Sequence, residues 1–519
     1  MSDQAWECND SLLQFADAEP QRRDRITLDG LRWDDAAPDA SVSLDVNAAA
    51  VLEGVVVKSR RRRRVLRLDC GAYAKEFVYD GIRAIFKRFF GGNAAREAGK
   101  FLQMSAKGIA VPTLVGWGRE TKGLFLVRDV LITREIPSAV HLDRFMSQSY
   151  PALSFRDRQQ FLTQLAEFVR GLHDQGVLHR DMHRGNVMIT EASGTYSFFL
   201  LDVDRVRLHS QPLSPRQRAC NLTPILTNLA STTRVFRFFR AYGVDTRSAA
   251  GRDFLHLFHH VSFSHRYKIW ESKARRCLHT NRYFIKERRG GYTVYRRRSV
   301  KSDAVVDLLV KDPDALLETG ETLKLGRAHT AAKVYLNGKP YFLKRYNRKG
   351  LLYRLKYAFR RSAVLRNWST TWGFNVRGLP VPLPLVVLEH RRFRLLSNCY
   401  ILFTYADDAQ PLYRIWPTLD GAQKKSVLGS FLTTLKRLYF SGGFHQDLKW
   451  SNVLVRPRDN RFEVILIDLD GARLRRRQTP PKRRMKDVKR FFIELDRHEP
   501  EGRFKLAICL SLQSETGFV

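Results

Sequence analysis

The stretch "HRDMHRGNVMI" at residues 179–189, followed by "FFLLDVDRV" at 198–206, decides the fold class of this chain. The same pattern returns as "HQDLKWSNVLV" at 445–455 and "VILIDLDGA" at 464–472. In each copy an Asp precedes an Asn by five residues, and another Asp follows that Asn by 16 residues. The residues are Asp181, Asn186 and Asp202 in the first copy and Asp447, Asn452 and Asp468 in the second.

This spacing fits the chemistry of phosphoryl transfer. Transfer from ATP needs a carboxylate that accepts the proton of the attacking hydroxyl, and oxygen ligands that hold Mg²⁺ against the phosphates. In a catalytic loop of the kinase type, the Asp faces the acceptor and the Asn five residues later binds the metal. A single such loop is a weak signal, because Asp and Asn are common turn residues. Two copies with identical spacing favour catalysis over a structural role.

The duplication extends over a whole domain. The segment "AYAKEF" (72–77) corresponds to "PYFLKRY" (340–346), which aligns Lys75 with Lys344, and "GIAVP" at 108 corresponds to "GLPVP" at 378. The offsets are 344 − 75 = 269 at the lysines, 378 − 108 = 270 at the second pair and 447 − 181 = 266 at the loops. Such a long period excludes a solenoid, whose repeats span roughly 20 to 50 residues.

Composition agrees with two globular domains and with an anionic partner. The chain has 519 residues, 44% of them hydrophobic, and a formal net charge of +38 that attracts polyanions. Its six cysteines are scattered without metal-ligand spacing, which favours a reducing compartment. We expect neither a signal peptide nor a membrane-spanning segment, because the N-terminus is acidic and no apolar run approaches 18 residues.

Each repeat predicts a small β-rich lobe followed by a helical lobe, and hence an α+β chain of two tandem, bilobal, protein-kinase-like domains. Alternating segments such as "KVYLNGKPYFLKRY" (333–346) predict a hairpin that turns at "NG" and leads to the lysine. Long helical patterns then precede the two catalytic loops. We predict a loosely ordered extension at residues 1–40, a first kinase-like domain at 41–270 and a second at 271–519.

These motifs in this order resemble the bacterial lipopolysaccharide core kinases, the Kdo and heptose kinase family, which has a protein-kinase-like fold. The resemblance covers roughly residues 50 to 500. The second copy is the closer match, through "YFLKRYNRKGLLYRLKYAFRRSAVLRNW" (341–368) and "HQDLKWSNVLV", whereas "HRDMHRGNVMI" looks like a general small-molecule kinase loop. The shared motifs specify phosphoryl transfer better than they specify the acceptor.

The resemblance implies ATP and Mg²⁺ as cofactors and a role for each aligned residue. The lysines would hold the ATP phosphates, the first Asp of each copy would orient and deprotonate the acceptor hydroxyl, and the Asn with the later Asp would bind Mg²⁺. These assignments are Lys75, Asp181, Asn186 and Asp202 in the first copy and Lys344, Asp447, Asn452 and Asp468 in the second. We expect His179 and His445 to pack the loops.

Three features depart from the usual kinase pattern. Glu97 lies 22 residues after Lys75, as expected for a glutamate that steers the lysine, but the aligned residue in the second copy is Asn367. A neutral amide cannot form that ion pair, so we expect Lys344 to be less firmly placed, and an inactive second copy stays open. Both copies read Asp-x-Asp instead of "DFG", and the later Asp could anchor the strand end. "SRRRRR" (59–64) replaces a glycine-rich loop; its arginines could bind phosphate or form a solvated turn.

The segments after the two lysine strands predict basic amphipathic helices. In "GIRAIFKRFF" (81–90) and "GLLYRLKYAF" (350–359), apolar residues fall on one helical face with Arg and Lys between them. Such helices can lie on an anionic membrane surface or pack their apolar faces on the small lobe. The basic cluster at 472–490 adds positive charge after the second copy's metal-binding Asp.

We therefore expect an ATP-dependent kinase that phosphorylates a sugar hydroxyl, on heptose or Kdo, of the lipopolysaccharide inner core. Its partners would be the core–lipid A glycolipid and the anionic inner-membrane surface, and its location cytoplasmic and peripheral on that membrane. Specific nucleic-acid binding is not expected, because no zinc finger or aromatic RNA-binding signature accompanies the charge. Two alternatives stay open: a protein or small-metabolite kinase, and a membrane-associated scaffold of two pseudokinases.

Overall fold

In the computed structural model, the chain forms two compact units that divide inside one helix, between Ser262 and Phe263. The structure describes residues 23–28, 31–34, 51–226, 232–298, 300–347, 357–458 and 461–501, with single positions at 350, 352, 355 and 504. The dividing helix, α7 (Ala249–Arg275), contributes residues to both units. The predicted domain boundary between residues 270 and 271 also falls within α7. The residue at which one functional domain ends and the next begins stays a prediction.

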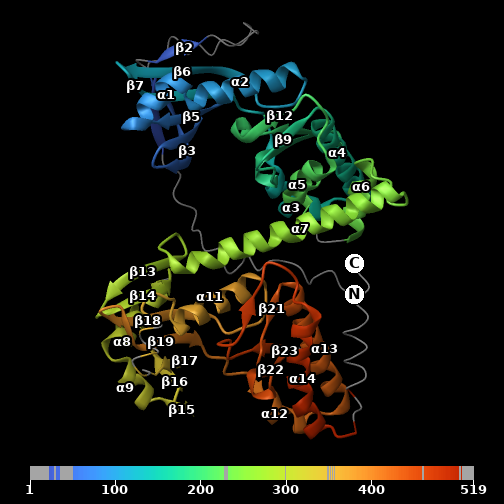
Figure 1. The fold of residues 1–519 in the computed structure, drawn as a ribbon. Coiled ribbons are helices and arrows are strands. Elements are labelled where there is room, and N and C mark those ends of the chain that lie inside the picture. The colour runs from blue at the N-terminus through green and yellow to red at the C-terminus, as the bar shows by residue number, and fades with distance from the viewer. Residues whose placement is uncertain are drawn as a thin grey trace. The chain divides into compact units, whose positions relative to one another are not determined.

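Each unit is bilobal and kinase-like, with a seven-stranded antiparallel sheet followed by a mainly helical lobe (Figure 1). In unit 1 the sheet order is β1-β3-β4-β5-β7-β6-β2. Its strands are β1 (Arg23–Thr27), β2 (Arg32–Asp34), β3 (Val51–Arg60), β4 (Arg63–Leu68), β5 (Ala72–Val78), β6 (Leu114–Lys122) and β7 (Phe125–Arg134). Helices α1 (Ile82–Phe90) and α2 (Asn93–Ala106) lie between β5 and β6 in sequence.

The helical lobe of unit 1 carries the first predicted catalytic loop between two short strands. Its elements are β8 (Val140–His141), α3 (Leu142–Gln148), α4 (Phe155–Asp174), β9 (Val177–His179), β10 (Val187–Ala192), β11 (Thr195–Leu200), β12 (Val206–Leu208), α5 (Pro215–Leu226), α6 (Thr232–Ala241) and α7. Ser154 caps α4 by accepting a hydrogen bond from the Asp157 amide. The apolar face of α4 places Phe161 in the core, where its ring contacts Phe145 and Tyr196.

Unit 2 repeats this plan with a sheet of order β13-β14-β18-β19-β17-β16-β15. Its small lobe contains β13 (Phe284–Arg289), β14 (Tyr292–Arg297), α8 (Val300–Lys311), α9 (Pro313–Glu318), β15 (Glu321–Leu325), β16 (His329–Leu336), β17 (Lys339–Tyr346), α11 (Ala363–Val376), β18 (Pro384–Arg392) and β19 (Leu395–Thr404). The predicted hairpin is confirmed: β16 and β17 pair, and Asn337 and Gly338 between them both have positive φ, as a tight primed turn requires.

The second helical lobe places its catalytic loop on an aromatic core. Its elements are β20 (Gln410–Pro411), α12 (Leu412–Ile415), α13 (Gly421–Phe440), β21 (Gly443–Phe444), β22 (Val453–Arg458), β23 (Arg461–Leu466), β24 (Arg473–Leu474) and α14 (Pro481–His498). Trp450, which belongs to the loop itself, is fully buried, and its ring lies 5.6 Å from that of Phe491 on α14. Phe491 in turn stacks on Phe431 of α13 at 4.0 Å. Packing therefore fixes the loop.

Part of the segment predicted as a loosely ordered extension, residues 1–40, forms strands. Residues Arg23–Thr27 pair with β3, and Arg32–Asp34 pair with β6. The alternation in Arg23–Thr27 buries Ile26 completely, which explains the pairing. Apart from Leu28 and Leu31, the remaining residues of that extension lie outside the described residues. No helix in the described part of the chain is both long and apolar enough to cross a membrane.

Candidate active sites

The first site is built around Lys75, which β5 holds between β4 and β7. The lysine is only 9% exposed, and its Nζ lies 2.6 and 2.7 Å from the two carboxylate oxygens of Glu97 on α2. The same Nζ lies 2.9 Å from Oδ1 of Asp202, which follows β11. The structure thus brings three of the predicted site residues into direct contact, with the lysine at the centre.

A basic side chain that sequence reasoning could not assign also reaches this site. Nη2 of Arg63, from the "SRRRRR" stretch, lies 3.1 Å from Oδ1 of Asp202. Burial alone would raise the pKa of Asp202, but the charges and hydrogen bonds of Lys75 and Arg63 outweigh burial and lower that pKa to about 2. Burial raises the pKa of Glu97, and Lys75 opposes this rise. Asp202 is therefore ionised at neutral pH.

The first catalytic loop is shaped by a buried histidine. The backbone N–H of Asp181 donates to Nδ1 of His179 at 3.1 Å, so Nε2 carries the proton and donates to the Leu201 carbonyl at 3.0 Å. Asn186 closes the loop, because its Nδ2 donates to the carbonyl of Asp181 at 2.9 Å. The Asp181 carboxylate stays accessible, with its Oδ2 3.5 Å from Nη1 of Arg205. His179 therefore holds the loop, and Asp181 faces outward.

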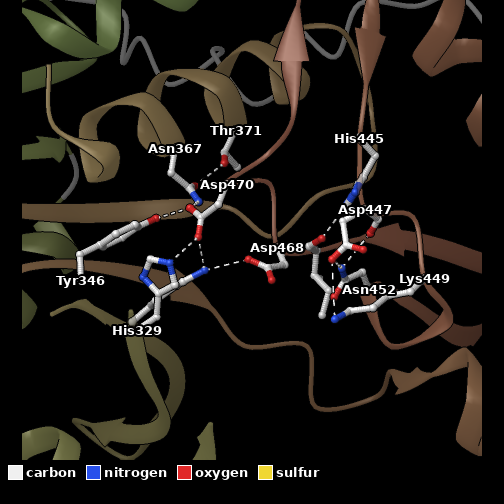
Figure 2. Close-up of polar contacts among 12 residues, drawn as sticks. His329, Tyr346, Asn367, Thr371, His445, Asp447, Lys449, Asn452, Asp468 and Asp470 are labelled. Atoms are coloured by element: carbon white, nitrogen blue, oxygen red, sulfur yellow. Dashed lines mark hydrogen bonds and ion pairs between the residues drawn. The ribbon is translucent and has the colours of Figure 1, made fainter. Parts of the chain in front are cut away.

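The second site holds its lysine with a different carboxylate. Nζ of Lys344 lies 2.8 Å from Oδ1 of Asp468 and 2.6 Å from Oδ2 of Asp470. Asn367 does not contact the lysine; its Nδ2 donates to Oδ1 of Asp470 at 2.6 Å. The hydroxyl of Tyr346 donates to the same oxygen. Figure 2 shows Asn367 and Tyr346 converging on Asp470, with Asp468 on the other side.

Asp470 therefore takes the place that Glu97 holds in the first site. Burial raises the pKa of Asp470, but Lys344, Tyr346 and Asn367 outweigh it and lower the pKa to about 2. Burial alone would lower the pKa of Lys344, but the charges of Asp470 and Asp468 outweigh burial and raise that pKa. The expectation that Asn367 leaves Lys344 less firmly placed is wrong for this reason. The interpretation that the later Asp only anchors the strand end is also wrong for Asp470.

The equivalent residue in the first unit behaves differently. Asp204, two residues after Asp202, is exposed, and its backbone carbonyl accepts a hydrogen bond from Lys100. Sequence reasoning identified both Asp-x-Asp motifs but missed the function of the second Asp in the second copy. Two features of the sequence together indicate this function: residue 367 is neutral where a glutamate is expected, and Asp470 is a nearby carboxylate with no other assigned role.

The second catalytic loop keeps the predicted arrangement. Nδ2 of Asn452 donates to the carbonyl of Asp447 at 2.9 Å, and Nε2 of His445 donates to the Ile467 carbonyl at 2.8 Å. Two cations face the Asp447 carboxylate: Nζ of Lys449 at 3.7 Å and Nε of Arg490 at 3.4 Å. Figure 2 shows Asp447, Lys449 and Asn452 grouped at this loop. These cations could draw a phosphate toward Asp447.

A buried carboxylate that sequence reasoning missed holds the backbone at the start of the second loop. Asp487 on α14 accepts hydrogen bonds from the backbone N–H groups of His445 at 2.8 Å and Gln446 at 2.7 Å. Gln446 has a φ of 73°, so these bonds stabilise a backbone conformation that is otherwise unfavourable. In unit 1, Asn221 on α5 has the comparable task, since its Nδ2 donates to the His179 carbonyl.

The donor set at each site suits Mg²⁺ that is bound together with a nucleotide. Each site offers one ionised carboxylate and one amide oxygen, from Asp202 and Asn186 or from Asp468 and Asn452. Among the described residues, no three His, Cys, Asp or Glu side chains lie close enough to hold a metal ion. Mg²⁺ commonly completes such a set with phosphate oxygens and water. The residues therefore fit a metal that arrives with its nucleotide.

One family of known proteins matches both units of the chain. The model of the lipopolysaccharide kinase (Kdo/WaaP) family matches residues 59–242 and 309–500, one segment in each unit. The search of solved structures found "WaaP in complex with acyl carrier protein", with 20% sequence identity over 41% of this chain and 88% of that chain, and a TM-score of 0.32. No curated protein matches the chain significantly.

Proposed function

Since this chain belongs to the lipopolysaccharide kinase (Kdo/WaaP) family, we propose that it transfers the γ-phosphate of ATP to a hydroxyl of an inner-core sugar, heptose or Kdo. The observation that carries the proposal is the doubled constellation of lysine, paired carboxylates and Asp-Asn loop in the two matched segments. The family supports a kinase acting on lipopolysaccharide. The identity of the sugar and the use of ATP belong to the proposal.

Corresponding residues would have the same roles at both sites. Lys75 and Lys344 neutralise charge on the nucleotide phosphates, and their carboxylate partners fix the position of each Nζ. Asp181 and Asp447 accept a hydrogen bond from the acceptor hydroxyl, orient it toward the phosphorus and take its proton as the new bond forms. The buried histidines and Asn side chains hold these loops in place.

Mg²⁺ would be held by Asn186 and Asp202 at the first site and by Asn452 and Asp468 at the second. When bound, it would neutralise negative charge on the phosphates. The low pKa of Asp202, about 2, means that this ligand is ionised at neutral pH. The pKa of Asp468 is also lowered, because the charge and hydrogen bond of Lys344 outweigh burial.

We propose that both sites are catalytic. The strongest argument against the second site was the neutral Asn367, and Asp470 supplies the missing carboxylate 2.6 Å from Lys344. A pseudokinase would have no need to keep the lysine, two aspartates and the Asp447–Asn452 loop together. The net charge of +38 suits an anionic glycolipid acceptor at a membrane surface. We place the protein at the cytoplasmic side of the inner membrane on that basis.

The test is phosphate transfer from labelled ATP to purified core–lipid A. Wild type is compared with Asp181→Asn, Asp447→Asn and the double variant, and Asp204→Asn serves as a matched control because that carboxylate is exposed. We expect partial loss in each single variant and loss of nearly all activity in the double variant. Loss in one single variant alone would assign catalysis to one unit. Mg-ATP binding without transfer to any core would refute the glycolipid assignment and favour a protein or metabolite acceptor.

A further inference from the structure

Helix α1 presents large apolar side chains to solvent. Ile82, Phe86, Phe89 and Phe90 are 74, 59, 67 and 75% exposed, and their spacing places them along one face of the helix. We call these four residues the α1 apolar face. The helix packs on unit 1 through the opposite side, where Ala84 is 3% exposed. For these four residues of α1, the interpretation that the apolar face packs on the small lobe is therefore wrong.

The charged residues of α1 itself are all positive. Arg83 and Arg88 are exposed, Lys87 is half-buried and donates to Oδ1 of Asn93 at 2.7 Å, and the sequence of α1 contains no acidic residue. Soluble proteins rarely leave several neighbouring aromatic side chains in water without a partner. The partner of this face must accept aromatic side chains and carry negative charge.

Unit 2 has similar exposed groups after its own lysine strand. Leu352, Leu355 and Phe359 are 84, 52 and 83% exposed. Phe393, in the β18–β19 turn, is 88% exposed, and Cζ of Arg394 lies 5.3 Å above the ring of Phe359. The combination of exposed apolar groups with arginines thus occurs at the same point of both repeats, although the sequences differ.

We propose that the α1 apolar face inserts into the headgroup region of an anionic lipid bilayer. A helix with an aromatic face and flanking cations is suited to this interface, where rings enter the acyl boundary and cations meet lipid phosphates. Because α1 begins 82 − 75 = 7 residues after Lys75, docking would bring the first site to membrane-borne acceptors. That consequence rests on the proposed function, but lipid binding itself does not.

The experiment is flotation of the full-length protein with vesicles that contain phosphatidylethanolamine and phosphatidylglycerol. Vesicles of phosphatidylcholine alone test the need for negative charge. The main variant is Phe86→Ser/Phe89→Ser/Phe90→Ser, and its matched control is Phe155→Ser, which removes an aromatic ring of 64% exposure from α4. Arg83→Gln/Arg88→Gln separates the electrostatic contribution. Thermal unfolding and Mg-ATP binding verify that each variant is folded.

We expect wild type and Phe155→Ser to float with the anionic vesicles, and the triple variant to bind at least tenfold more weakly. The Arg variant should bind more weakly and show a smaller salt dependence of binding. Equal flotation of the triple variant, or equal binding of wild type to phosphatidylcholine, would overturn the proposal. Absence of vesicle binding, with a wild-type dimer that the triple variant converts to monomer, would assign the face to a second copy instead. Phosphorylation of detergent-dispersed core by the triple variant tests the proposed function separately.

Discussion

Buried Lys344 and half-buried Asp470 form an ion pair with 2.6 Å between Nζ and Oδ2, and this pair replaces the lysine–glutamate pair of the first unit. The carboxylate has moved from the helix after the lysine strand to the loop that contains Asp468. Asn367, which stands where the helical glutamate would be, now donates a hydrogen bond to the relocated carboxylate. Each lysine therefore has a second carboxylate partner, although the two units supply it from different parts of the chain.

Asp470→Asn should impair the second site selectively. The substitution removes one of two carboxylates from a lysine that is 6% exposed, and an under-compensated buried charge is strongly unfavourable. In a chain whose first site is disabled by Asp181→Asn, we expect kcat/KM for ATP to fall about tenfold or more. A tenfold fall corresponds to a loss of about 1.4 kcal/mol of transition-state stabilisation. Steady-state kinetics measure this effect. Asp204→Asn in the Asp447→Asn background is the control and should change little.

Adding Asn367→Glu to Asp470→Asn should restore much of the lost kcat/KM. The new glutamate would stand where Glu97 contacts Lys75 in the first unit, so it tests placement of the lysine rather than general stability. Asn367→Glu alone should not improve activity, because two neighbouring carboxylates would then repel each other. A double variant that is folded but no better than Asp470→Asn would contradict the positioning role of Asp470.

Comparison of the two repeats located Lys75 and Lys344, whose roles at the sites stay predictions. Local spacing was enough to predict the positions of the Asp-Asn loops and of the β16–β17 hairpin. Their residues lie within a few positions of one another, and the "NG" turn has a direct backbone requirement. The contacts of Asp470 and Asp487 could not be predicted in this way. Asp470 lies 126 residues from Lys344, and Asp487 lies 42 from His445, so only the folded chain shows that they meet.

The N-terminal strands escaped prediction for a different reason. Residues 1–40 are rich in Asp and Ala, and this composition outweighed the short alternation that buries Ile26. A five-residue strand on the edge of a sheet carries little periodic signal of its own. Its pairing with β3 depends on an apolar surface formed by distant parts of unit 1.

Arg63→Gln should weaken nucleotide binding at the first site. Arg63 contacts Asp202 and comes from the strand that occupies the place of a phosphate-binding loop, so we expect its guanidinium to bind nucleotide phosphate. Charge-assisted hydrogen bonds contribute about 1.5 to 3 kcal/mol, which predicts a rise in KM for ATP of roughly tenfold with a smaller effect on kcat. Kinetics in the Asp447→Asn background measure it. Arg61→Gln is the control, because Arg61 is exposed; equal effects of both variants would indicate a solvated basic turn.

Acid should destabilise unit 1 through His173. Its Nε2 donates to Oδ1 of Asn221 at 3.0 Å and its Nδ1 accepts from the Tyr242 hydroxyl at 2.6 Å, so the network fits the neutral ring. Burial lowers the pKa of His173 to about 4, from an ordinary 6.5. The unfolded chain therefore binds more protons than the folded chain between pH 6.5 and 4. The stabilisation is complete above pH 6.5 and is lost as the pH falls toward 4, by about 3 kcal/mol.

Hydrogen exchange of α4 and α5, corrected for the intrinsic pH dependence of exchange, measures this effect on unit 1 alone. Protection in wild type should decrease from pH 6.5 to 4, whereas His173→Gln should show a flatter dependence because glutamine can occupy the same network without titrating. Since Asn221 also binds the carbonyl of His179, the catalytic loop should lose protection over the same pH range. Parallel pH dependence in wild type and His173→Gln would assign the acid sensitivity to other groups.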